Sequence, residues 1–177
     1  MQIYIDFITG RVYQFDIDTT PSSQYTYVVG QNTSAVTLGN TTTNTKLATA
    51  TIPAGTLKIG DSVKILFAVT TNSNANSKNV NITINNTTAS VFGQLTMTAH
   101  TGGVMEVTIK VVSLTSVRAV NMSNNSSYST TTSASPRNYT ISNINSNAFT
   151  IDIYGQKVTS GADTLILEHF CAVVQRS

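Results

Sequence analysis

Apolar and polar residues alternate with a period of two along most of this chain. In residues 62–70 the apolar side chains stand at every second position, and the same spacing recurs in 79–84, 104–112 and 149–154. Such spacing places the apolar side chains on one face of a β-strand and the polar ones on the other. No stretch combines an apolar 3.6-residue stripe with capping residues, so the sequence predicts almost no helix.

The alternating segments predict about a dozen strands, which are separated by turn-like pairs such as Gly39-Asn40, Gly60-Asp61 and Gly102-Gly103. Many short strands with such breaks are typical of an antiparallel β-sandwich or barrel. The predicted strands lie near residues 2–8, 11–17, 24–29, 46–52, 61–70, 79–84, 89–99, 103–113, 115–122, 138–144, 148–154 and 162–174.

The last predicted strand is apolar on both faces. Strict alternation puts Leu165, Leu167, Cys171 and Val173 on one face and Ile166, Phe170, Ala172 and Val174 on the other. A strand of this kind lies in the centre of its sheet or against another subunit. Cys171 is the one cysteine of the chain, so the fold does not depend on an internal disulfide, and we expect a small buried hydrophobe.

The first 22 residues differ from the rest in charge and aromatic content. Three Asp and one Arg give residues 1–20 a side-chain charge of −2, whereas the other residues sum to +4. The segment predicts a hairpin that turns at Thr9-Gly10, and an isolated hairpin is marginal in water. We therefore expect an attachment arm at 1–22, followed by a sandwich domain at 23–177; the alternative is that the hairpin is the first strand pair of that domain. The expected attachment residues are Tyr4, Asp6, Phe7, Tyr13 and Phe15.

Aromatic residues are the main binding candidates. The early tyrosines suit a subunit or docking interface, and a sugar site is the alternative. Residues 121–137 form a long, polar, almost uncharged segment, which predicts either a binding loop or a mobile surface loop. Its candidate receptor contacts are Tyr128, Arg137 and Tyr139.

Composition excludes several classes of protein. Thr, Ser and Asn number 30, 19 and 17, together 66 of 177 residues, and these residues are poor in helix interiors. Charged residues are 10% of the chain and the net charge is +2, which argues against a nucleic-acid binder. No apolar run approaches the ~20 residues that span a membrane. The N-terminus shows no secretory signal, which predicts synthesis and folding in a cytoplasm.

The sequence offers no clear catalytic or metal-binding pattern. The two histidines, His100 and His169, stand far apart, and no Gly-x-Ser-x-Gly motif presents a nucleophile. The acidic residues are scattered, and the cysteine and histidines lack zinc-ligand spacing. We therefore predict no catalytic residue, cofactor or metal.

One stretch is more specific. Residues 47–61, LATATIPAGTLKIGD, read as a strand, a Pro-Gly corner, a Leu/Ile plug and a Gly-Asp turn that feeds a long strand. Together with the strands at 149–154 and 165–174, this stretch resembles the β-jelly-roll domains of bacteriophage virion proteins such as tail fibres, tailspike tips and head-decoration or head-fibre proteins. The resemblance covers about residues 45–175, and it implies a jelly roll and the possibility of a homotrimer. No catalytic residue carries over from it.

The leading hypothesis is therefore a non-enzymatic virion protein, a trimeric jelly roll attached through residues 1–22 to a capsid or tail. Head decoration, head fibre and receptor-binding fibre tip are open alternatives within it. The second hypothesis is a module or adhesin that binds a glycan on a host surface. An enzyme is the third, and a close pair of carboxylates in a cleft would favour it.

Overall fold

The computed structural model describes residues 2–6, 11–15, 26–85, 91–99, 101–124, 138–159 and 163–177. All regular structure in these ranges is β-strand, and no helix occurs among them. The strands are β1 (Gln2–Asp6), β2 (Arg11–Phe15), β3 (Thr26–Gln31), β4 (Val36–Thr37), β5 (Thr45–Ile52), β6 (Ser62–Thr71), β7 (Lys78–Ile84), β8 (Val91–Met97), β9 (Gly102–Ser113), β10 (Ser116–Asn124), β11 (Asn138–Thr140), β12 (Phe149–Lys157) and β13 (Leu165–Gln175).

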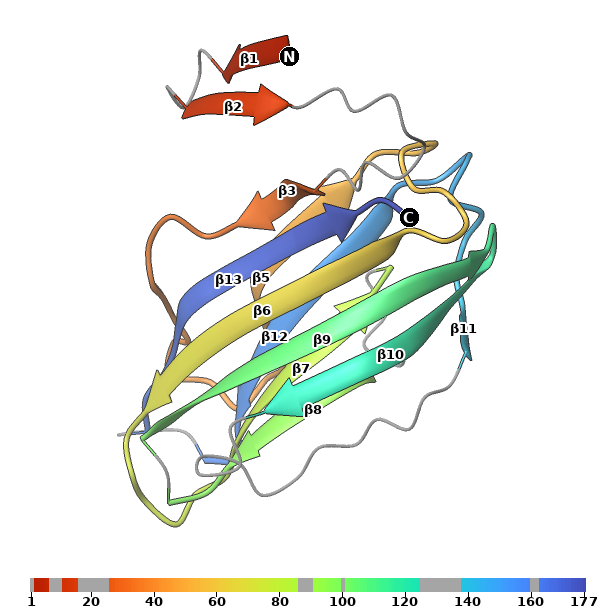
Figure 1. Cartoon of the computed structure of the whole chain (residues 1–177). Helices are drawn as coiled ribbons and strands as arrows, with labels where there is room; N and C mark the ends of the chain where they lie inside the picture. Colours follow the sequence, from red (N-terminus) through yellow and green to blue (C-terminus); the bar gives the residue numbers. More distant parts are fainter. Residues whose placement is uncertain are drawn as a thin grey trace.

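Two antiparallel sheets pack face to face in a sandwich (Figure 1). The larger sheet has the order β11-β10-β9-β6-β13-β3, with β4 beside β13, and the smaller has the order β5-β12-β7-β8. The antiparallel partners β7–β8, β6–β9, β5–β12 and β3–β13 form one long rolled hairpin. This pairing is the jelly-roll topology, so the predicted fold class is confirmed. Strands β10 and β11 are additions that extend the larger sheet beyond β9.

The predicted apolar faces meet in the core between the sheets. Val63, Ile65, Phe67 and Val69 of β6 are buried, as are the alternating apolar residues of β7, β9 and β12. Most of the expected strands are present within a few residues. The structure adds the two-residue strand β4 and extends β12 to Lys157.

Strand β13 departs from strict alternation. A β-bulge lies between Leu167 and His169 in the pairing with β6, and it leaves Glu168 and His169 both exposed. An extra residue reverses which later side chains face inward. Beyond the bulge Phe170 therefore joins Leu165 in the core, while Cys171 points outward and is only partly buried. The predicted face assignment of β13 and the expected burial of Cys171 are thus corrected.

The corner at residues 53–61 closes one end of the sandwich. Leu57 is buried in the core, whereas Ile59 is exposed. Of the two residues of the expected Leu/Ile plug, only Leu57 therefore packs into the sandwich. Gly60 has a φ of 100° and a Cβ there would lie 2.6 Å from the Ser177 hydroxyl, which explains why the turn requires glycine.

The N-terminal hairpin forms a two-stranded sheet of its own. β1 pairs with β2 in the register Tyr4↔Tyr13, and neither strand pairs with the sandwich. At the start of the long polar segment 121–137, β10 continues to Asn124. The first four residues of the expected 121–137 loop are therefore strand, and residues 125–137 lie outside the described ranges.

Candidate functional surfaces

The described ranges contain no cluster of side chains that could hold a metal ion. No three His, Cys, Asp or Glu residues gather there. His169 stands exposed on the β13 bulge, and His100 lies outside these ranges. The described residues contain no helix that is long and apolar enough to cross a membrane. The remaining candidate surfaces are the two outer faces of the sandwich, and a group of polar residues is buried at one end of its core.

The outer face of the larger sheet carries an apolar patch in its centre. Register places Leu66 beside Cys171, Ala68 beside Val104, and Val173 beside Val28. Val28 and Val104 are 50% and 43% exposed, and the other members are partly buried. The patch thus consists of Val28, Leu66, Ala68, Val104, Cys171 and Val173.

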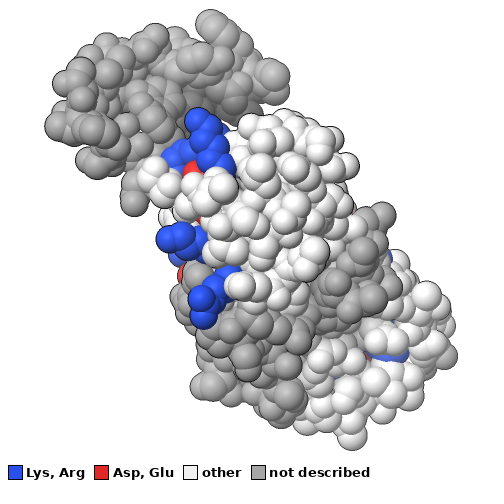
Figure 2. Space-filling model, turned by 90° about the vertical axis from the view of Figure 1, so that its right-hand side faces the viewer, with Lys and Arg blue, Asp and Glu red and all other residues white. Residues whose placement is uncertain are grey.

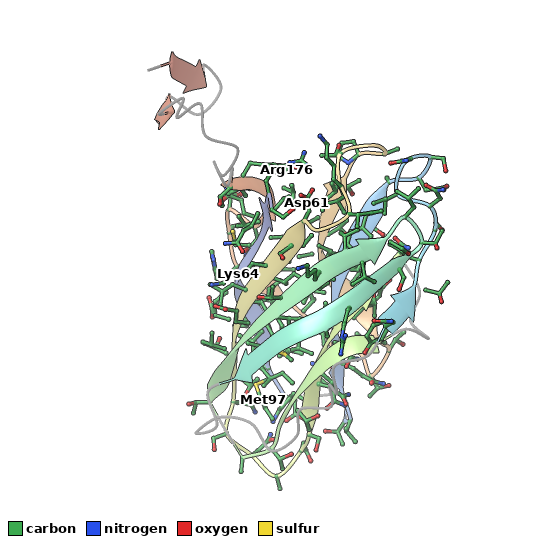
Figure 3. All side chains as sticks on the ribbon, turned by 45° about the vertical axis from the view of Figure 1, so that its right-hand side comes forward. Asp61, Lys64, Met97 and Arg176 are labelled. Carbon is green, nitrogen blue, oxygen red and sulfur yellow. The ribbon has the colours of Figure 1, made fainter. Side chains whose placement is uncertain are left out.

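Charged side chains surround this apolar patch. Lys64 and Glu106 form an ion pair of 3.0 Å on the same face, and exposed pairs of this kind contribute at most about 1 kcal/mol. Lys110 lies opposite Arg118 on the β9–β10 side, while Glu168 lies on the β13 side and accepts a hydrogen bond of 2.5 Å from Thr70. Lys and Arg side chains are spaced along one side of the molecule in Figure 2, and Figure 3 shows Lys64 on β6.

Cys171 is the thiol within the apolar patch. Burial raises the pKa of this thiol above its ordinary value, which keeps it protonated and a poor nucleophile at neutral pH. Its chemistry favours packing over catalysis, and its partial exposure makes it a reporter of whether the patch is covered.

The outer face of the smaller sheet is polar. Cross-strand rows on this side contain Thr49, Asp152, Tyr154 and Asn81 with other Thr, Asn and Gln side chains. Thr49 is exposed, whereas Asp152, Tyr154 and Asn81 are buried. Lys46 pairs with Asp152 at 2.9 Å and lies 5.6 Å from the centroid of the Tyr154 ring. The hydrogen bond to Asp152 raises the pKa of Lys46, and the Thr49 hydroxyl donates to the same carboxylate. We call this surface the polar face.

Several acceptors on the polar face have no hydrogen-bond partner. Asn79, Asn81 and Thr83 alternate along β7 with the core residues Val80 and Ile82, so their side chains lie on the side of the sheet away from the core. Their side-chain oxygens and Oδ2 of Asp152 are buried and unpartnered. A cluster of unpaired acceptors on one face is unusual in a folded protein.

Two lysines are buried at one end of the core. Lys78 and Lys157 are 1% and 2% exposed and face each other across β7 and β12. Lys78 donates to the Asn72 carbonyl at 3.1 Å and to the Asn74 side chain, and Lys157 donates to the Asp163 carbonyl at 2.8 Å. These bonds tie the flanking loops together, so the cluster is structural.

Asp163 is the carboxylate of this buried cluster. Hydrogen bonds from Asn74, then from Thr159 and Asn76, and the nearby charge of Lys78 lower its pKa from 3.8 to about 2. Because the pKa of Asp163 is lower in the folded chain than in the unfolded chain, its carboxylate stabilises the fold at pH values above its unfolded-state pKa. This contribution is lost as the pH falls from about 4 towards 2.

We expect Asp163→Asn to lower the melting temperature at neutral pH and to flatten the decline of stability between pH 3.8 and about 2. The measurement is thermal unfolding followed by circular dichroism across this pH range. Glu168→Gln, which removes an exposed carboxylate and leaves the cluster intact, is the matched control. An acid profile of Asp163→Asn that matches the wild type would contradict the assignment.

The residues expected from sequence are scattered. Tyr4 and Asp6 lie in β1 and Tyr13 and Phe15 in β2, whereas Phe7, Tyr128 and Arg137 lie outside the described ranges. Tyr139 lies in β11 and packs into the core with 9% of its surface exposed, so it is not displayed as a receptor contact. The roles of the arm and the loop stay predictions.

Neither the polar face nor the buried lysine pair was predicted from the sequence. Lys78 and Lys157 stand at even spacing from the core residues Val80 and Ile153 of the same strands. The alternation of each strand therefore places both lysines on the inward face, and this spacing could have predicted their burial. The polar face had no such signal, because it depends on which strands become neighbours.

Among the solved structures that resemble this chain, a phage protein module is a distant structural match. No protein-family model and no curated protein sequence matches the chain. The CBM2 module of the evolved Dit of Lactobacillus casei BL23 phage J-1 is similar in structure, with a TM-score of 0.40, 10% sequence identity, and coverage of 85% of this chain and 96% of that chain.

Proposed function

We propose that the protein is a non-enzymatic structural component of a phage virion, a homotrimeric jelly roll displayed on the particle surface as a head decoration, head fibre or fibre tip. The observation that carries this proposal is the apolar patch on the outer face of an already complete sandwich. The assignment to a virion comes from the resemblance of residues 47–61, and the jelly-roll topology is consistent with it.

The apolar patch supports self-association. Soluble monomers seldom expose a contiguous apolar surface without a binding role, and stable interfaces have an apolar centre with a polar rim. In a ring of three copies, each subunit presents a different side of its surface to each neighbour. Lys110 and Arg118 lie on one side of the patch and Glu168 on the other, so the cations of one copy can approach the carboxylate of the next.

Residues 1–22 are proposed as the attachment arm to the capsid or tail. The β1–β2 sheet shares no strand pairing with the sandwich, and a lone hairpin requires packing against something else. The residues proposed for this contact remain Tyr4, Asp6, Phe7, Tyr13 and Phe15.

Deleting residues 1–22 is expected to abolish incorporation into phage particles and to leave the sandwich folded and self-associated. The reason is that every strand pairing of the two large sheets lies within residues 26–177. Particle incorporation is measured by quantitative immunoblotting of purified phage, and folding by circular dichroism. Incorporation of the truncated chain at the level of the full chain would refute the arm.

A further inference from the structure

The buried lysine cluster at one end of the core holds more cations than anions. Lys78 and Lys157 are 1% and 2% exposed, and Asp163 is 6% exposed. These three side chains contribute two ammonium groups and one carboxylate. Buried charges are normally paired, because a charge that has lost its hydration without gaining a partner is costly. A change that removes one of the two cations would therefore balance the charge of the cluster.

The side chain of Asn74 lies between one of these cations and the carboxylate. Its Oδ1 accepts a hydrogen bond from Nζ of Lys78, and its Nδ2 donates one to Oδ1 of Asp163. An ammonium group only donates and a carboxylate only accepts, so these two partners fix the orientation of the amide. The amine nitrogen therefore stands at the carbonyl end of the amide and the carboxylate at its amino end, as a nucleophile and a stabilised leaving group would.

We propose that Lys78 and Asn74 become joined by a covalent isopeptide bond. Nζ of Lys78 attacks Cγ of Asn74, a bond forms between these atoms, and the bond between Cγ and Nδ2 breaks. Two protons pass from the ammonium group to the departing nitrogen, which leaves as an ammonium ion. Atoms, charge and electrons balance without an oxidant, a cofactor or any other co-reactant, and the cluster keeps one cation and one carboxylate.

The surroundings of Asn74 supply what this reaction needs. Holding two reacting groups in contact gives effective concentrations of about 10⁵–10⁸ M, which compensates for the low reactivity of an amide. The Asp163 carboxylate faces the departing nitrogen and stabilises the positive charge that develops there. Hydrogen bonds from Thr159 at 2.8 Å and Asn76 at 3.3 Å hold this carboxylate in position. Asn74 itself is half-buried, so the ammonium ion can leave to solvent.

Tryptic digestion of the full chain followed by mass spectrometry tests this inference. Trypsin cleaves after Lys and Arg but not after a lysine whose Nζ is acylated. Lys64, Lys78 and Lys110 are successive basic residues, so an unlinked chain gives the peptides 65–78 and 79–110. We expect instead a single peptide 65–110 whose mass is lower than that of its sequence by about 17 Da, the mass of one ammonia.

Four variants identify the reacting groups. Lys78→Arg keeps the positive charge and the tryptic site but removes the amine, and Asn74→Ala removes the carbonyl, so both should give the two unlinked peptides. Asn76→Ala changes another asparagine of the same loop and should keep the link. Asp163→Asn removes the charge beside the departing nitrogen, and we expect it to slow formation of the link by about a hundredfold.

Three outcomes would overturn the isopeptide bond. The first is a wild-type chain that gives peptides 65–78 and 79–110 with the masses of their sequences. The second is loss of ammonia within a cleaved peptide 65–78, which would indicate a succinimide at Asn74. The third is a mass loss that persists in Lys78→Arg, which would place the modification elsewhere. The inference is independent of the virion proposal, since neither particles nor oligomeric mass enter this test.

Discussion

Replacing Leu66 with glutamate is expected to convert a three-chain assembly into single folded chains. Leu66 stands in the apolar patch beside Cys171 and Glu106, and its side chain points away from the core. A second carboxylate beside Glu106 in a covered interface meets like-charge repulsion and loss of hydration, which together cost several kcal/mol. In the separated chain the same carboxylate is solvated, so the sandwich keeps its fold.

Light scattering coupled to gel filtration measures this change directly. Val158→Glu is the matched control, because Val158 is 58% exposed and lies in the turn after β12, outside the patch. The Cys171 thiol gives a second readout, since it should react slowly with thiol reagents in the assembly and faster in Leu66→Glu.

Each mass has a definite meaning for this interface. A wild-type mass of one chain would overturn self-association, and a mass of two chains would keep the interface and overturn the trimer. A three-chain mass that persists in Leu66→Glu would place the interface elsewhere on the molecule.

The inward faces of the long strands were predictable from sequence because burial imposes a strict period. The apolar residues of β6, β7, β9 and β12 lie in the core in the predicted phase. The bulge in β13 was not predictable, since Glu168 and His169 look like ordinary members of an alternating strand. Its cause is partly non-local: the Asn32 side chain hydrogen-bonds to the backbone of Phe170 and of Glu168.

The candidate surfaces were less predictable than the core. Asn81 and Asp152 lie near each other only because β7 and β12 pair in the sheet. The order of the strands in a sheet cannot be predicted from the periodicity of the sequence. The apolar patch was partly foreseeable, because β13 is apolar on both faces. The bulge then decided that Cys171 and Val173, rather than Phe170 and Ala172, face outward.

Replacing Asp61 with alanine is expected to cause a large loss of stability, about 3 kcal/mol. Asp61 is 2% exposed, pairs with Arg176 at 2.5 Å and accepts the Lys58 backbone N–H at 2.8 Å; Figure 3 shows Asp61 and Arg176 together at one end of the sandwich. Arg176 follows β13 directly, and its guanidinium also lies 5.7 Å from the centroid of the Tyr27 ring on β3. The carboxylate therefore holds the end of a central strand to the corner that precedes β6.

Urea unfolding at a fixed protein concentration measures this loss, because self-association makes stability depend on concentration. Asp61→Asn is the graded control: its amide oxygen still accepts the Lys58 N–H, but it carries no charge for Arg176, so its loss should fall between wild type and alanine. If Asp61→Ala unfolds within about 0.5 kcal/mol of wild type, as an ordinary surface substitution would, the turn does not anchor the C-terminal strand. Equal losses in the two variants would instead assign the stabilisation to the ion pair, with the turn hydrogen bond contributing little.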